Sequence, residues 1–131
     1  MSKRKCIRID PNKDKKVAIY LDINCFAEFS THIYRDSKEK RLEYIFNAIY
    51  RDIYTRDIFE MYKDYPGTGT MKLSKGNDNL RVYCKVENID SVLRLTISTI
   101  HSKKNQQLSK KEIRILESIQ KREYEYREKW I

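Results

Sequence analysis

The residues best suited to chemistry in this sequence are basic and aromatic side chains in its second half. They are Lys72, Arg81, Tyr83, Lys85, Arg94, Lys103 and Lys104. Arginine binds phosphate oxygens through paired hydrogen bonds, and a lysine whose pKa is lowered within a cationic cluster can transfer protons. The set is therefore typical of a site for a phosphodiester.

An RNA phosphodiester is a substrate that such a set could cleave, because RNA carries its own nucleophile, the 2′-hydroxyl. The protein must deprotonate this hydroxyl, stabilise a pentacoordinate dianion and protonate the departing 5′-oxygen. Tyr83 can stack on a base or donate a proton, and His101 can act as a general base near pH 7. Plainer interpretations stay open: a basic face that only binds polyanions, and a histidine that is solvated or structural.

Other site chemistries find no matching motif. Cys6, Cys25 and Cys84 are widely separated, and the chain has only two histidines, so no zinc or disulfide pattern is present. Three glycines and two prolines do not make a glycine-rich phosphate loop. We expect the acidic residues to lie on helix surfaces, where they do not converge on a metal. The sequence thus predicts no metal and no small-molecule cofactor.

The composition favours a polyanionic partner. The 131 residues include 28 Lys and Arg against 19 Asp and Glu, a formal net charge of +9, and clustered cations gain affinity by releasing counterions. Ten Tyr, four Phe and one Trp are too many for a disordered basic tail. No apolar run resembles a membrane span or a signal peptide. We expect one soluble, cytoplasmic domain over residues 1–131, with a basic N-terminal extension at 1–16.

In the first half, residues 6–10 and 17–21 read as strands separated by a turn. Helical spacing of apolar residues predicts a helix over 24–34, capped by Asp22 or Asn24. An apolar stripe then predicts an amphipathic helix over 37–63, bent near 54–56. The short connection between the helices favours an antiparallel hairpin.

The second half changes to a period of two after the Pro-Gly-Thr-Gly segment at 66–69. Residues 70–74 read as a short strand, 76–78 as a turn, and 80–86 and 93–97 as a hairpin. If both apolar sets face the core, paired positions must sum to an odd number. A two-residue loop at 88–89 satisfies this rule and pairs Cys84 with Leu93. A four-residue loop satisfies it as well.

Either register gives the sheet one apolar face and one face that is basic, hydroxylated and open. Ser109 followed by Glu112 matches a capping box and predicts a C-terminal helix whose inward positions include Leu116 and Ile119. The predicted fold class is α+β: N-terminal strands and a helical hairpin packed on an antiparallel sheet, followed by a C-terminal helix.

From Thr70 onward the chain resembles the RelE/ParE superfamily of bacterial toxins, most closely its HigB-type branch. The segment Met71-Lys-Leu-Ser-Lys-Gly-Asn-Asp-Asn-Leu-Arg-Val-Tyr83 is similar to the family's Lys-Leu, loop, Leu-Arg-x-Tyr run. Ser102-Lys-Lys-Asn-Gln-Gln-Leu-Ser-Lys-Lys-Glu-Ile113 is similar to the Lys-Lys run that opens the family's last helix. Residues 115–126 resemble the terminal helix that ends in Arg and Tyr. The resemblance covers about half of the chain.

The resemblance implies a metal-independent mRNA endoribonuclease that acts on the ribosome and is held inactive by a cognate antitoxin. Arg81 would stabilise the scissile phosphate and Lys72 would contact it or assist proton transfer. Tyr83 and Lys104 would complete the catalytic group that the resemblance implies, and His101 is added to it for its own chemistry. The RNA-binding positions would be Lys75, Lys85, Arg94, Lys103, Tyr124 and Tyr126.

The chain departs from the family pattern at three places. Ser109 stands where the family often has proline, His101 stands where it usually has an apolar residue, and residues 1–69 are longer than typical. Two alternatives therefore stay open: a non-catalytic nucleic-acid-binding module on the same scaffold, and a ParE-like inhibitor of gyrase.

Overall fold

The computed structural model describes residues 3–10, 16–73, 79–102 and 109–129. Its framework is one seven-stranded sheet in the order β3-β4-β5-β6-β2-β1-β7. Four strand pairings are antiparallel, whereas β2 with β6 and β1 with β7 are parallel. The strands are β1 Arg4–Arg8, β2 Val17–Asp22, β3 Phe59–Met61, β4 Thr68–Lys72, β5 Leu80–Ile89, β6 Val92–Ser102 and β7 Tyr124–Arg127.

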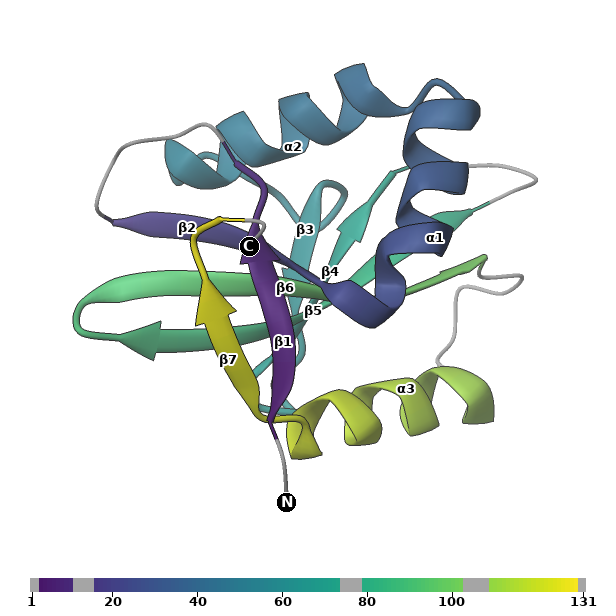
Figure 1. Cartoon of the computed structure of the whole chain (residues 1–131). Helices are drawn as coiled ribbons and strands as arrows, with labels where there is room; N and C mark the ends of the chain where they lie inside the picture. Colours follow the sequence, from purple (N-terminus) through teal and green to yellow (C-terminus); the bar gives the residue numbers. More distant parts are fainter. Residues whose placement is uncertain (1–2, 11–15, 74–78, 103–108, 130–131) are drawn as a thin grey trace.

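Helices cover both faces of this sheet, with α2 above it and α3 below it in Figure 1. The helical segments are η1 Ile23–Cys25, α1 Phe26–Phe29, the π-helical η2 Ser30–Arg35, α2 Glu39–Tyr50 and α3 Lys110–Lys121. The larger core lies between the sheet and the segments η1 to α2. A smaller one places Tyr83 of β5 against Leu116 and Ile119 of α3. The α+β class is confirmed, but the expectation of an open second face is wrong because α3 packs on it.

The first half confirms both predicted strands and the helical region after them. The β2 run is buried on both sides, as expected for an interior strand flanked by β6 and β1. The Asp22 side chain accepts a hydrogen bond from the Asn24 backbone and caps η1, so Asp22 is the cap and not Asn24. Asp10, Asp22 and Glu112 are buried, so the expectation that acidic residues lie on helix surfaces is wrong at these three positions.

The predicted helix over 37–63 is wrong beyond Tyr50. The chain turns at Asp52, whose φ is 53°, and Ile53 is 58% exposed although it continues the apolar stripe. Phe59 then enters β3 opposite Met71 and is buried, so pairing within the sheet overrides helical periodicity. The antiparallel hairpin is wrong too, because in Figure 1 α2 runs across the top while the α1 segment descends at its end.

The β5–β6 hairpin has a two-residue turn at Asp90 and Ser91, both with positive φ of 53° and 64°. Positive φ at both positions matches a type I′ turn, whose twist suits a hairpin. The turn is thus two residues later than predicted, and Cys84 pairs with Ile97 instead of Leu93. From the turn as far as this pair, paired positions sum to 181, an odd number as predicted. A bulge follows, so that Val82 lies opposite Ile100 and the sum becomes even.

The C-terminal helix begins as predicted, since Ser109 and Glu112 form both hydrogen bonds of a capping box. It ends at Lys121, and the prediction of helix through Tyr126 is wrong. Residues Tyr124–Arg127 instead form β7, which adds to the sheet beside β1. Part of the predicted N-terminal extension is therefore an inner strand, held between β2 and β7.

The capping box gives a first prediction. Replacing Ser109 by alanine removes the side-chain acceptor of the Glu112 backbone N–H, and we expect the free energy of unfolding to fall by about 1 kcal/mol. Urea unfolding followed by circular dichroism measures this. Ser118→Ala, at an exposed position of the same helix, is the matched control and should leave stability unchanged or slightly raised. Equal stability of the two variants would contradict the capping role.

Candidate phosphodiester site

Strand pairing brings three of the predicted site residues into one row. Lys72 of β4 lies directly opposite Arg81 of β5, and Arg81 lies directly opposite His101 of β6. Directly opposed residues of antiparallel strands point to the same face. The neighbours Met71, Val82 and Ile100 are buried in the larger core, so the row faces the other side, where α3 lies. We call Lys72, Arg81 and His101 the cationic row.

Arg81 is the member of this row with unmet hydrogen-bonding capacity. Its Nε and Nη1 atoms are buried and have no hydrogen-bond partner among the described residues. Buried donors without partners are costly, and most occurrences in proteins have a ligand, an ion or water to explain them. A guanidinium with two unpartnered nitrogens is suited to hydrogen bonding with an anion.

The other two members differ in their charge. Lys72 Nζ lies 3.0 Å from Glu60 Oε1 of β3, which neutralises its charge in the free protein. Burial lowers the pKa of His101, nearby Lys111 lowers it further, and Glu112 opposes these effects. The His101 imidazole is therefore neutral at pH 7 and able to accept a proton. Arg81 is the one cation of the row that has no acidic partner in the described structure.

Tyr83 is held beneath α3 and does not face solvent. It is fully buried, and its hydroxyl donates a 2.6 Å hydrogen bond to Glu112 Oε2. Burial, followed by the contact with Glu112, raises the pKa of Tyr83 above its usual range. A buried ring cannot stack on a base, and a phenol with this pKa stays protonated, so the predicted role of Tyr83 in stacking is wrong in this structure.

Glu112 and Tyr62 are neighbours of the row that sequence reasoning did not select. Glu112 is 1% exposed and joins the helix cap at Ser109 to Tyr83. Tyr62, which follows β3, has its pKa raised by burial and then by Glu60 and Glu112, while Arg81 opposes the rise. The capping box was the one sequence signal at Glu112, and it indicates a helix start, not a site.

Lys85 and Arg94 are not part of the cationic row, and each contacts another part of the protein. Lys85 Nζ donates to the backbone carbonyls of Gln120 and Arg122, where it caps the C-terminal end of α3. Arg94 stacks over Tyr126, with its Cζ 4.5 Å from the ring centroid. Both residues were predicted to lie on an open RNA-binding face, and both are instead held in contacts within the protein, although the buried Arg94 Nε has no hydrogen-bond partner among the described residues.

The C-terminal tyrosines also point elsewhere. Tyr124 is buried and its hydroxyl donates to Asp22 at 2.6 Å, whereas Tyr126 donates to Glu87. Neither hydroxyl bonds to a residue of the row, so the structure does not bring these tyrosines together with Arg81 as the resemblance implied. Three further predicted residues, Lys75, Lys103 and Lys104, lie outside the described residues.

Other chemistries have little material in the described part of the chain. No group of three His, Cys, Asp or Glu side chains there could hold a metal ion. The three cysteines are buried, and burial raises the pKa of Cys6 and of Cys25 to about 12 in each case. No described helix is both long and apolar enough to cross a membrane.

Comparisons with known proteins add no relative. No family model, no curated protein and no solved structure matches this chain.

The Tyr83–Glu112 contact gives a second prediction. Tyr83→Phe leaves Glu112 Oε2 without this donor in a buried site, and we expect the free energy of unfolding to fall by about 1–3 kcal/mol. Chemical denaturation measures the loss. The control is Tyr34→Phe, which removes a hydroxyl from a side chain that is 59% exposed. A loss at Tyr83 no larger than at Tyr34 would show that the contact does not hold α3 on the sheet.

Proposed function

We propose that this protein is a metal-independent endoribonuclease that cleaves mRNA, and that it acts as the toxin of a toxin–antitoxin pair. The observation that carries the proposal is the cationic row, in which an arginine with two unpartnered donors lies directly opposite a neutral histidine. A phosphate binder and a proton acceptor side by side are the two groups that cleavage by the 2′-hydroxyl needs first.

The proposed reaction uses the row as follows. Arg81, whose Nε and Nη1 have no partner among the described residues, donates to a non-bridging oxygen of the scissile phosphate and stabilises the dianion as it forms. His101 accepts the proton of the 2′-hydroxyl, whose oxygen attacks phosphorus. The bond to the 5′-oxygen breaks, which leaves a 2′,3′-cyclic phosphate and a 5′-hydroxyl. Lys72, once phosphate draws it from Glu60, protonates the leaving oxygen or binds phosphate.

Part of the element order supports the biological part of the proposal. Strands, helical segments, antiparallel strands β4 to β6 and α3 follow one another in the order that the resemblance implies, whereas β3 and β7 are additional to it. The proposed partners are accordingly mRNA on the ribosome and a cognate antitoxin protein, in the cytoplasm. A nucleic-acid-binding module without catalysis would use the same unpartnered Arg81 donors, so the test must separate binding from cleavage.

The third prediction concerns Arg81 in cells. We expect induction of the wild type to arrest bacterial growth and to create new mRNA 5′ ends within reading frames, and Arg81→Ala to abolish both. The matched control is Arg114→Ala, which removes the same charge from an exposed position of α3. A toxic Arg81→Ala protein would contradict the assignment. Growth arrest with DNA damage and intact messages would favour the gyrase inhibitor.

The fourth prediction concerns the pH dependence of cleavage by purified protein. Because burial lowers the pKa of His101, the base is neutral over a wider range than an ordinary histidine, whose pKa is about 6.5. The cleavage rate should rise with pH, and the midpoint of this rise should lie below about pH 6.5. His101→Asn should lower the rate by about 10²–10⁴-fold and flatten the profile.

Two controls define this experiment. His32→Asn alters the other histidine of the chain, which lies on η2 beside Asp36 and away from the row, and should leave the rate unchanged. RNA with a 2′-deoxy substitution at the cleaved position should bind without being cut. Binding with no cleavage of unmodified RNA, with or without ribosomes, would reject the ribonuclease and leave the binding module.

A further inference from the structure

Two further basic side chains, Arg4 of β1 and Arg122 at the C-terminal end of α3, lie beside β6 beyond the point where β2 ends. The last β2–β6 pair is Leu21 with Ile97, and η1 and α1 lie beside the following part of β6. Here the surface forms an open pocket of about 200 Å³. Its lining residues are Arg4, Asn24, Cys25, Glu28, Ser98, Thr99 and Arg122.

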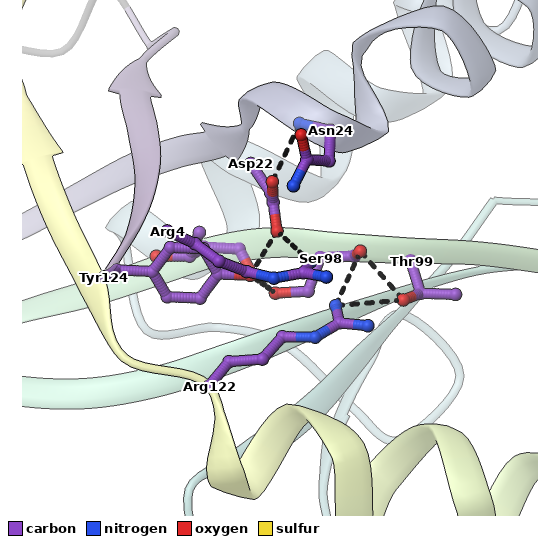
Figure 2. Close-up of polar contacts among 8 residues, drawn as sticks. Arg4, Asp22, Asn24, Ser98, Thr99, Arg122 and Tyr124 are labelled. Carbon is purple, nitrogen blue, oxygen red and sulfur yellow. Dashed lines mark hydrogen bonds and ion pairs between the residues drawn. The ribbon is translucent and has the colours of Figure 1, made fainter. Parts of the chain in front are cut away.

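Two guanidinium groups from opposite ends of the chain converge on this pocket (Figure 2). Arg4 Nη1 donates to Asp22 Oδ2 at 2.8 Å. Arg122 Nη1 donates to the Ser98 carbonyl at 2.9 Å and to Thr99 Oγ1 at 3.2 Å. These bonds hold each guanidinium through one nitrogen. The other hydrogen-bond donors of Arg122 have no partner among the described residues.

The charges of the pocket are not balanced around Arg122. Asp22 is fully buried and forms an ion pair with Arg4. Arg122 has neutral oxygen partners and no carboxylate partner in the described structure. Glu28 lines the pocket but is exposed, where water screens its charge. The pocket therefore keeps an unpaired guanidinium, a group whose fork of N–H donors matches phosphate.

The size and position of the pocket narrow the choice of ligand. At about 200 Å³ it is smaller than the usual 300–1,000 Å³ of small-molecule sites, so it suits one charged group better than a whole cofactor. Thr99 and His101 are two residues apart and share the face of β6 that meets Tyr83 and Arg81. Two residues of a strand span about 7 Å, so a strand of nucleic acid at His101 can reach Arg122.

We propose that the pocket of Arg4 and Arg122 binds a phosphate of the RNA chain next to the phosphate held by the cationic row. This rests on the proposed function for the identity of the polyanion, but it requires binding alone and no cleavage. Arg122 supplies the principal contact, and Arg4, whose charge is balanced by Asp22, forms part of the wall of the pocket.

The test measures the affinity of an uncleavable 2′-O-methyl RNA oligonucleotide by fluorescence anisotropy at several salt concentrations. Arg122→Gln should weaken binding about tenfold and reduce the slope of log K against log salt by about 0.7, the value for one phosphate on single-stranded nucleic acid. Thermal unfolding of the variant shows whether it remains folded. An unchanged affinity and slope in a folded Arg122→Gln protein overturns the proposal.

A variant that is expected to bind RNA more tightly completes the test, because unfolding of the protein could not produce a gain in affinity. Glu28→Gln removes the exposed carboxylate at the pocket, so its affinity should rise above that of the wild type. Glu43→Gln, at an exposed position of α2, changes the net charge equally but lies elsewhere and is the matched control. An equal gain in both variants would mean that only net charge matters, which contradicts the pocket.

Two further measurements separate this proposal from its alternatives. Inorganic phosphate that stabilises the wild type, combined with RNA affinity independent of Arg122, would assign the pocket to a free anion and overturn the RNA subsite. If RNA binds through Arg122 but is never cleaved, the subsite stands and the ribonuclease fails. If Arg81 is required for cleavage but Arg122 contributes nothing to binding, the ribonuclease stands and the RNA subsite fails.

Discussion

The buried carboxylate of Asp22 is the contact on which several elements depend. It has no exposed surface, and it accepts hydrogen bonds from Arg4 of β1, the Asn24 backbone of η1 and Tyr124 of β7. A charge in such a place is tolerated when it is paired and its oxygens are satisfied. The end of β2, the start of the helices and the last strand are thereby fixed at one point, beside the pocket of Arg4 and Arg122.

The sequence predicted elements that have a local cause. The alternation in β5 and β6 and the Ser109–Glu112 box needed no knowledge of the remaining chain. The covering of the second face of the sheet depends on contacts between residues far apart in sequence. In the alternating pattern of its strand, Tyr83 takes a polar position, but α3 packs on this face and buries it in a core. The predicted continuation of the helix after residue 50 is wrong for the same reason. Phe59 is buried by pairing with a distant strand, and the helical spacing of apolar residues carries no information about that pairing.

The candidate site was predictable in composition but not in arrangement. Lys72, Arg81 and His101 could be selected by type, yet only pairing across three strands puts them in one row. Lys85 and Arg94 share their face of the sheet but are used by α3 and by Tyr126. Basic residues of one face therefore divide into structural and available cations, and this division follows from partners that lie far away in sequence.

A single extra residue in β6 connects the two sites. With the register that holds near the turn, where paired positions sum to 181, Arg81 would lie opposite Ile100 and His101 would face the core. The bulge shifts the register, so His101 meets Arg81 and Ile100 enters the core. The same bulge leaves Ser98 unpaired with β5, and Ser98 contacts Tyr124 through its hydroxyl and Arg122 through its carbonyl. Bulges re-aim side chains next to functional sites, and this one positions the proposed base and the proposed phosphate pocket together.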